Sequence, residues 1–444
     1  MLEKLFHLKA KNTTIRNEVI GGITTFLAMA YILGVNPAIL ADAGMDTTSV
    51  FMATAISAGF ASILMGILAN YPVSLAAGMG VNAMFSYTIV LGMGMSWQGA
   101  LASVFVSGLL FVVVSLTGIR QMIINAIPKN LKFAIGAGIG FFVAFVGLKN
   151  AGLIIANDAT FVGLGNLSDP TVLLALTGIL ITIILVIKNV PAAVFVGMLI
   201  TAVLGLIFNA MGFAGMPTLP ETIFEQNFTM NGVGAFVQGL GDLFANPFNA
   251  FVAIFSLLFV DFFDTAGTLV AVGSRIGLIN DKGELENCER ALLADSIGTV
   301  VGAALGTSTV TSFVESSSGV EAGGRTGLTA VVTGCLFFVS ILFAPLILSC
   351  VTNAVTAPAL VVVGIMMAQQ LKEIEWNDLV YAAAGFMTVV MMILTYSISN
   401  GIAFGFITYA LGMIAAKRAK EVHPTVWALL VIFIIYFALP YIQL

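Results

Sequence analysis

Five carboxylic acids stand inside or beside long apolar runs of this 444-residue chain. Asp261 and Asp264 lie in FSLLFVDFFDTAGTLVAV, Asp295 lies in RALLADSIGTVVGAALG, and Glu315 and Glu321 lie in TSFVESSSGVEAGGRTG. Ionisable side chains are costly inside a membrane and usually have a function there. No Lys or Arg occupies the middle of these runs. Such acids are suited to carrying a proton, or to accepting hydrogen bonds from a neutral solute rich in N–H groups.

The spacing of these acids suggests different roles. Asp261 and Asp264 are three residues apart and therefore share one face of a helix. Small residues, Thr-Ala-Gly-Thr, follow Asp264 and allow a ligand to approach closely. We expect Asp264 to couple transport to protons, with Asp261 as its competitor for that role. Asp295 lies five residues from Arg290, so either a local ion pair or a functional role is open to it.

The composition is that of a polytopic membrane protein. The chain is 59% hydrophobic and only 9% charged, whereas soluble domains carry about 25% charged residues. The three cysteines have no metal-binding or disulfide spacing, and neither histidine lies in an apolar run. No HExxH, GxSxG or P-loop motif is present. We therefore expect no enzyme activity, no cofactor, no metal and no nucleic-acid partner.

Fourteen apolar runs are long enough to be spanning candidates, seven on each side of a more polar stretch at 211–247. The first run is expected to be retained in the membrane, because no signal-peptide cleavage site follows it. A further apolar segment at 425–441 is either another span or an interfacial helix. The fourteen runs are 20–40, 50–69, 74–93, 98–117, 131–149, 171–187, 191–210, 248–272, 289–305, 308–323, 326–350, 355–371, 378–397 and 400–416.

The positive charges predict the orientation. If the spans alternate from a cytoplasmic N-terminus, every Lys and Arg except Lys149 falls on the cytoplasmic side, whereas 211–247 falls outside and contains none. Two halves of seven spans have opposite orientations, which is the inverted-repeat plan of many secondary transporters. The third run of each half is rich in small residues and carries one polar residue, Asn82 or Glu315. We expect both runs to be interrupted helices that line a binding site.

Several long motifs carry a resemblance to a known family. They are RNEVIGGITTFLAMAYILGVNP, AAGMGVNAMFSY, VDFFDTAGTL, ALLADS, GTSTVTSFVESSSGV and TAPALVVVG. With them the chain resembles the nucleobase–cation symporter-2 superfamily nearly end to end, and within it the AzgA-like purine permeases, especially bacterial guanine/hypoxanthine permeases.

The resemblance implies an all-α fold of fourteen helices in two inverted sevens, with short extended stretches in the third and tenth spans. It implies a core domain from 20–117 and 248–350, and a gate domain from 131–210 and 355–416. The core would move like an elevator, usually coupled to protons, although sodium stays open. The gate would also make the contacts of a homodimer.

The same resemblance implies the site. Asp264 and Glu315 match the paired substrate-binding acids, and Asn82 matches their polar partner from the third span. Thr265 and Ser316, next to the acids, are expected to line the site. A phenylalanine is expected to stack on the base; the candidates are Phe85, Phe262, Phe263 and Phe313. Glu321 departs from the small residue expected there, which leaves its role open.

Purine chemistry fits these acids. Guanine presents N1–H and a 2-amino group side by side, a match for both oxygens of a carboxylate, whereas hypoxanthine presents N1–H alone. The predicted function is purine import across the cell membrane, with guanine or hypoxanthine as substrate. An adenine or xanthine permease of the same fold is the alternative. An anion transporter of the sulfate-permease type is disfavoured, because paired acids repel anions.

Overall fold

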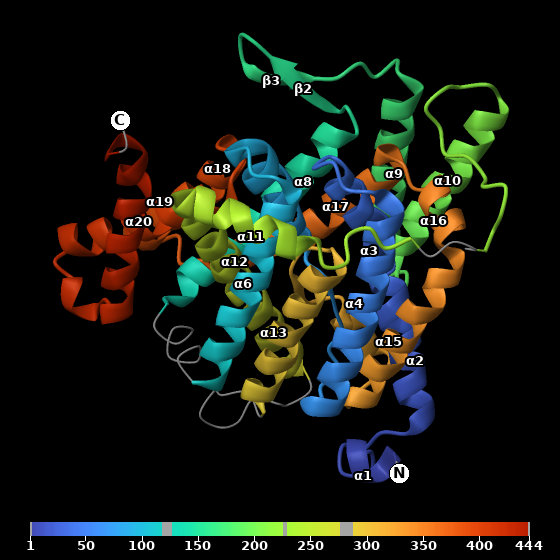
Figure 1. Cartoon of the computed structure of the whole chain (residues 1–444), viewed down its shortest axis with the longest axis horizontal. Helices are drawn as coiled ribbons and strands as arrows, with labels where there is room; N and C mark the ends of the chain where they lie inside the picture. Colours follow the sequence, from blue (N-terminus) through green and yellow to red (C-terminus); the bar gives the residue numbers. More distant parts are fainter. Residues whose placement is uncertain (1, 118–126, 225–228, 276–286, 443–444) are drawn as a thin grey trace.

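The computed structural model describes residues 2–117, 127–224, 229–275 and 287–442, apart from some side chains of α12 and α20. Figure 1 shows a mostly helical molecule. The helices that enclose its interior are α2 (Ile15–Met29), α3 (Ile32–Ala41), α4 (Thr47–Leu68), α6 (Trp97–Leu116), α8 (Lys129–Asn150), α9 (Pro170–Ile187), α10 (Ala193–Ala210), α12 (Pro247–Arg275), α13 (Cys288–Leu305), α15 (Gly327–Ser340), α17 (Asn353–Ala368), α18 (Leu379–Leu394) and α19 (Ile398–Ala415).

Shorter elements complete the described chain. They are the helices α1 (Leu2–Phe6), α5 (Met79–Ala83), α11 (Ala235–Ala245), α14 (Ser316–Glu321), α16 (Ala344–Cys350) and α20 (Pro424–Ile442), the π-helix η1 (Met84–Gly92), the 3-10 turns η2 (Ile341–Phe343), η3 (Gln369–Glu373) and η4 (Ala419–Glu421), and the strands β1 (Leu75–Ala77), β2 (Ile154–Asn157), β3 (Phe161–Leu164) and β4 (Val310–Ser312).

Within the described part of the chain, nine helical segments are long and apolar enough to cross a membrane. The first of them, Ile15–Ala41, joins α2 to α3. Shorter apolar helices, such as Leu379–Leu394, occupy other predicted runs. The chain is therefore a multi-pass membrane protein, as its composition predicts. The count of fourteen spans and the inverted repeat stay predictions.

Both interrupted runs contain extended backbone, as the family resemblance implies. β1 pairs antiparallel with β4, with Leu75 opposite Ser312 and Ala77 opposite Val310. Two further hydrogen bonds lengthen the ladder, from Gly78 N to Thr309 O and from Phe313 N to Ser74 O. Both strands are completely buried. Each strand therefore satisfies the backbone of the other at a depth where water is scarce.

Glycines let the chain pass closely around these strands. A Cβ added to Gly78 would lie 2.6 Å from Thr311 Oγ1 on β4. A Cβ added to Gly319 of α14 would lie 2.0 Å from Thr25 Oγ1 on α2. Side chains at either position would force the elements apart. The small residues of both runs therefore serve close backbone packing.

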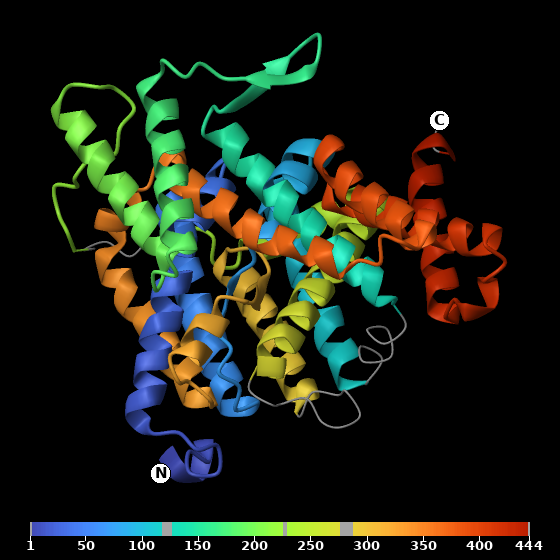
Figure 2. The ribbon, with the colours of Figure 1, turned by 180° about the vertical axis from the view of Figure 1, so that it is seen from behind.

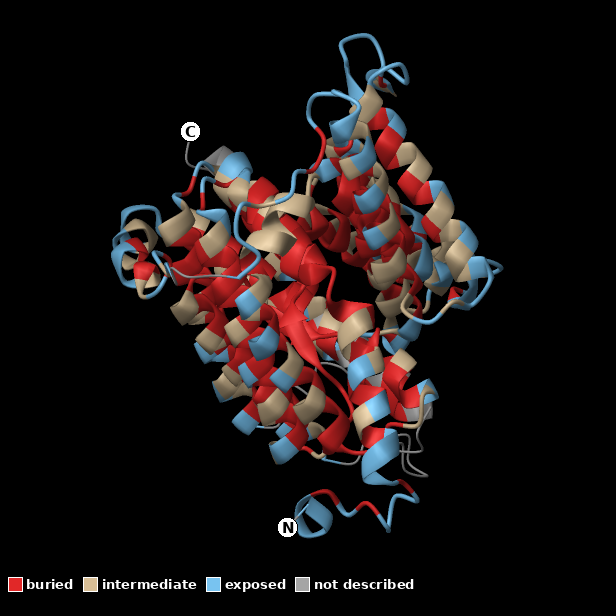
Figure 3. Ribbon diagram, turned by 90° about the vertical axis from the view of Figure 1, so that its right-hand side faces the viewer, coloured by how far each residue is buried: buried red, intermediate tan, exposed pale blue. Residues whose placement is uncertain are grey.

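The β2–β3 hairpin and α20 lie at the periphery of the molecule. The β2–β3 hairpin projects at the end opposite α1 in Figures 1 and 2. α20 forms a helix at one side of the molecule and packs on α12 and α19, where Phe433 contacts Phe255, Phe259 and Phe406. Figure 3 shows buried residues through the interior, with exposed residues on loops and outer helix faces.

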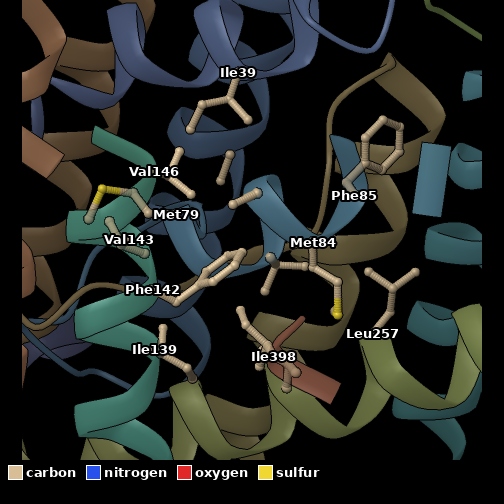
Figure 4. Close-up of a cluster of buried hydrophobic side chains, with 14 of the residues drawn as sticks. Ile39, Met79, Met84, Phe85, Ile139, Phe142, Val143, Val146, Leu257 and Ile398 are labelled. Atoms are coloured by element: carbon tan, nitrogen blue, oxygen red, sulfur yellow. The ribbon is translucent and has the colours of Figure 1, made fainter. Parts of the chain in front are cut away.

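One large apolar cluster joins the segments predicted as core to those predicted as gate. Figure 4 shows Met79 and Met84 from the interrupted third run facing Ile139 and Phe142 of α8 and Ile398 of α19. All five side chains are at most 8% exposed. Methionine is flexible and adapts to different neighbours. The contact between the two predicted domains is therefore largely apolar here.

Candidate functional site

Glu315 stands at the N-cap of α14, directly after the extended stretch of β4. Its side chain is buried, at 8% exposure. The hydroxyl of Tyr31 donates to Glu315 Oε1 over 2.5 Å, a short distance typical of an O–H donor on a carboxylate. The broken tenth run thus places this acid in the interior, as the sequence predicts.

Tyr31 was not among the residues that the sequence singled out. It lies in the break between α2 and α3, and it is 1% exposed. Its carbonyl accepts from Gly34 N and Val35 N, which starts α3 and fixes the backbone. The available signal was a phenolic hydroxyl in an otherwise apolar span, because a buried Tyr hydroxyl usually has a hydrogen-bond partner.

Asp264 projects from α12 toward the same strand. Thr311 Oγ1, in the middle of β4, donates to Asp264 Oδ2 over 3.3 Å. Helix α12 contacts both β4 and α14, and Glu315 is the N-cap residue of α14. The structure therefore brings together the two acids that were predicted to bind substrate.

Asp295 joins this acid cluster from α13 and is fully buried. Its Oδ1 accepts from Thr265 Oγ1 at 2.8 Å and from Ser312 Oγ at 3.3 Å. These bonds link α12, α13 and β4, and the choice between a local ion pair and a functional role for Asp295 stays open. The hydroxyl of Thr265, expected to line the site, is engaged with Asp295.

Asp261 is 1% exposed and faces a different neighbour. Thr299 Oγ1 of α13 lies 3.4 Å from Asp261 Oδ2 and 2.9 Å from the carbonyl of Val310. Asp261 is thus linked to α13, whereas Asp264 is linked to the side chains of β4. The two acids share a helix, and each is linked to β4, Asp264 directly through Thr311 and Asp261 through Thr299.

Asn82 lies in α5 and is fully buried. Its side-chain oxygen accepts a hydrogen bond from Ser308, which lies two residues before β4. Its amide nitrogen lies 3.4 Å from the carbonyl of Ala77. Asn82 is therefore tied to both strands of the crossing. Ser316 also links the two interrupted runs, because its hydroxyl accepts a 3.0 Å hydrogen bond from the backbone N–H of Ser74.

The candidate stacking residues are spread over the interior. Phe313 lies beside Tyr31, with ring centroids 6.4 Å apart and an interplanar angle of 39°. Phe262 packs near Phe111 at 6.2 Å, and Phe85 is buried in the apolar cluster of Figure 4. The side chain of Phe263 lies outside the described residues. Of the described phenylalanines, Phe313 is the one linked to the acid cluster through Tyr31.

The ion pairs of the described Lys and Arg side chains lie away from Asp264 and Glu315. Within the described ranges, neither Asp264 nor Glu315 forms an ion pair with Lys or Arg; the ion pairs found there involve Lys372 and Arg418. Lys149, the exception to the charge rule, lies over the rings of Tyr87 and Tyr396 at 5.0 and 5.2 Å. Glu321 is exposed at the end of α14.

A groove of about 540 Å³ between α6, α11 and α12 is almost entirely apolar. Its lining, which includes Leu110, Leu240 and Phe251, offers no polar group to orient a solute. The acid cluster, by contrast, combines carboxylate acceptors with hydroxyl donors. This arrangement suits a neutral, flat molecule that carries several N–H groups.

Comparisons with known proteins agree with this chemistry. A family model described as "Permease family" matches residues 16–404. The guanine/hypoxanthine permease PbuG of Bacillus subtilis is 49% identical over 98% of this chain and 99% of its own. The adenine permease AdeP of Escherichia coli is 41% identical over 98% of this chain and 95% of its own.

Solved structures show the fold. The transmembrane domain of a cyanobacterial bicarbonate transporter, BicA, aligns over 90% of this chain and 97% of its own, with a TM-score of 0.59 and 18% identity. The structure of SLC26A9 aligns over 89% of this chain and 65% of its own, with a TM-score of 0.61 and 11% identity.

Proposed function

This chain belongs to the Permease family, of the nucleobase–cation symporter-2 type that its motifs resemble, and we propose that it imports purine nucleobases across the cell membrane. Guanine and hypoxanthine are the proposed substrates, because two guanine/hypoxanthine permeases are 49% and 41% identical to it. Adenine is the second candidate, since adenine permeases are also 41% identical. The family indicates a transporter rather than an enzyme.

The meeting of Asp264 and Glu315 at the β1–β4 crossing is the observation that carries the proposal. Both acids are held by hydroxyl donors, from Thr311 and Tyr31, and neither has a cationic partner among the described residues. A purine supplies N–H donors to two such carboxylates from opposite edges of its ring. Phe313 is the proposed stacking residue.

We propose proton symport by an elevator-like movement of a core domain, 20–117 with 248–350, against a gate domain, 131–210 with 355–416. The largely apolar contacts of Figure 4 support this mechanism, because methyl and thioether groups can exchange neighbours during sliding at little cost. Asp264 is the proposed proton carrier. The fourteen spans, the cytoplasmic N-terminus and the homodimer belong to the same proposal and rest on the charge pattern and the family resemblance.

Anion transport is the rival function, because the solved structures with this fold include a bicarbonate transporter. At 18% identity that likeness concerns the fold alone. An acid cluster at the crossing repels anions, so purine transport fits better.

The experiment that tests the proposed function is uptake into purine-permease-deficient cells that express the chain. Labelled hypoxanthine, guanine, adenine and sulfate are compared, with and without a protonophore. We expect saturable hypoxanthine and guanine uptake that the protonophore abolishes, and no sulfate uptake. Sulfate uptake without purine uptake would contradict the proposal.

A further inference from the structure

The two oxygens of Glu315 have different surroundings. Oε1 accepts the 2.5 Å hydrogen bond from Tyr31, and the backbone N–H of Glu315 itself also bonds to its carboxylate. A hydrogen bond that short engages much of the charge on the oxygen that accepts it. Glu315 therefore offers a substrate a carboxylate in which Oε1 already accepts a hydrogen bond from a protein hydroxyl.

Tyr31 is held firmly in this position. It caps α3 through bonds from Gly34 N and Val35 N to its carbonyl, and its ring lies against Phe313. Phe313 is in turn fixed by its backbone bond to Ser74. With the ring 1% exposed, moving the hydroxyl away from Glu315 would require repacking both broken spans.

Hypoxanthine and guanine differ only in the 2-amino group. Hypoxanthine presents a single donor, N1–H, at this edge of the ring. Guanine presents N1–H and the 2-amino group together, which are best satisfied when both oxygens of one carboxylate accept. Because Oε1 already accepts from Tyr31, guanine is expected to gain less binding free energy from its second donor than it would at a free carboxylate.

We propose that Tyr31 is a specificity-determining residue, which reserves Oε1 of Glu315 and so favours hypoxanthine over guanine. This inference rests on the proposed purine transport and on Glu315 as the acid that meets N1–H. The 2-amino group of guanine must then share Oε1 with Tyr31 or lose a hydrogen bond. In either case the free energy that the amino group loses on leaving water is not fully recovered in the site.

The test is binding of hypoxanthine, guanine and xanthine to purified protein before and after Tyr31→Phe. We expect the affinity for guanine relative to hypoxanthine to rise about tenfold, the size of one added hydrogen bond to a charged group. Xanthine carries a carbonyl at C2 in place of the amino group, so its affinity relative to hypoxanthine should not rise.

Tyr87→Phe is the matched control. Tyr87 is also buried and donates to a carboxylate, Asp42 Oδ2, over 2.7 Å, but it belongs to the separate group around Lys149. Its loss should leave the ratio of guanine to hypoxanthine affinity unchanged. A general effect of losing a buried tyrosine hydroxyl would instead move both variants alike.

An unchanged ratio in Tyr31→Phe, or equal weakening of both bases, overturns the role of Tyr31. If that variant does not fold, the wild type decides: guanine bound more than about tenfold more tightly than hypoxanthine contradicts the proposal. A wild type that binds no purine at all would contradict the proposed function itself, which is a distinguishable result.

Discussion

Glu18 and Thr329 lie 311 positions apart in the sequence, yet three hydrogen bonds join them, one of them to the backbone carbonyl of Glu18. Glu18 Oε2 accepts from the hydroxyl of Thr329 at 2.6 Å and from its backbone N–H at 3.2 Å. The same carboxylate accepts from the backbone of Arg325 and Thr326, and it is fully buried. One acid of the first span therefore caps the start of α15.

Removing this cap should destabilise the protein. Glu18→Ala strands several buried N–H groups at once, so we expect a loss of about 2–4 kcal/mol in unfolding free energy. Thermal unfolding of the detergent-purified protein measures it as a lower melting temperature. Glu373→Ala, which removes an exposed acid, is the control and should leave the melting temperature unchanged.

Glu315→Gln should weaken purine binding strongly. The substitution keeps the shape of the side chain but loses the charge, and an amide N–H can then face the N–H of the base. We expect a cost of about 2–4 kcal/mol in binding, on the order of 30–1000-fold in Kd. Titration with hypoxanthine measures it. Glu321→Gln, on the exposed end of α14, should bind normally, and near-normal binding by Glu315→Gln would remove that acid from the site.

Asp264→Asn and Asp261→Asn should differ in energy coupling. Asp264 is linked to β4 and lies near Glu315, whereas Asp261 is linked to Thr299 of α13. If Asp264 carries the proton, its amide variant should lose concentrative hypoxanthine uptake at every pH tested, while Asp261→Asn keeps much of it. The measurement is accumulation in vesicles with an imposed pH gradient. The opposite ranking would assign the coupling role to Asp261.

Asn82 and Ser308 should act as one unit. Ser308 donates to the side chain of Asn82, so either Asn82→Ala or Ser308→Ala breaks the same link between α5 and the approach to β4. Each variant should weaken purine binding or change which purine is preferred. The double variant should bind hypoxanthine only slightly more weakly than Asn82→Ala alone. Proton dependence should survive in all three. Full additivity in hypoxanthine affinity would show that the two side chains act separately.

A disulfide across the apolar boundary should arrest transport. A Cβ added to Gly80 would lie 2.8 Å from Ile139 Cγ2, so Gly80→Cys with Ile139→Cys can reach the about 3.5–4.5 Å between Cβ atoms that a disulfide needs. In a background without the three native cysteines, oxidation should stop hypoxanthine uptake and a reductant should restore it.

The control pair lies within the proposed gate. A Cβ added to Gly412 would be 3.6 Å from Val380 Cβ, so Gly412→Cys with Val380→Cys forms a similar bridge between α18 and α19. Oxidation should leave this pair active. Full uptake by the oxidised Gly80 and Ile139 pair would contradict relative movement at that boundary.

Much of the fold follows from local patterns. The apolar runs correspond to helices, and the small residues around Asn82 and Glu315 mark the two interrupted spans. These features depend on hydropathy and on the positions of small residues, and both can be read from the local sequence. The two acids proposed to bind substrate stand out in the sequence for a similar reason, because an acid in an apolar run has few structural explanations.

The partners of those acids could not be predicted in the same way. Tyr31 and Glu315 are 284 positions apart, and Thr265 and Asp295 are 30 apart on different helices. Such contacts depend on how spans are arranged around one another, which no local pattern states. The partners of Thr265 and Ser316 were likewise not predictable from their place next to the acids: their hydroxyls bond to Asp295 and to the backbone of Ser74, and their role in lining the site stays a prediction.

The pairing of β1 with β4 constrains the order in which the chain can mature during synthesis. Leu75 leaves the ribosome 237 residues before its partner Ser312. Until then, the peptide groups of β1 have no strand to pair with at membrane depth, where unpaired backbone is costly. The peptide groups of β1 must therefore bond to water or to another part of the chain until β4 has been made.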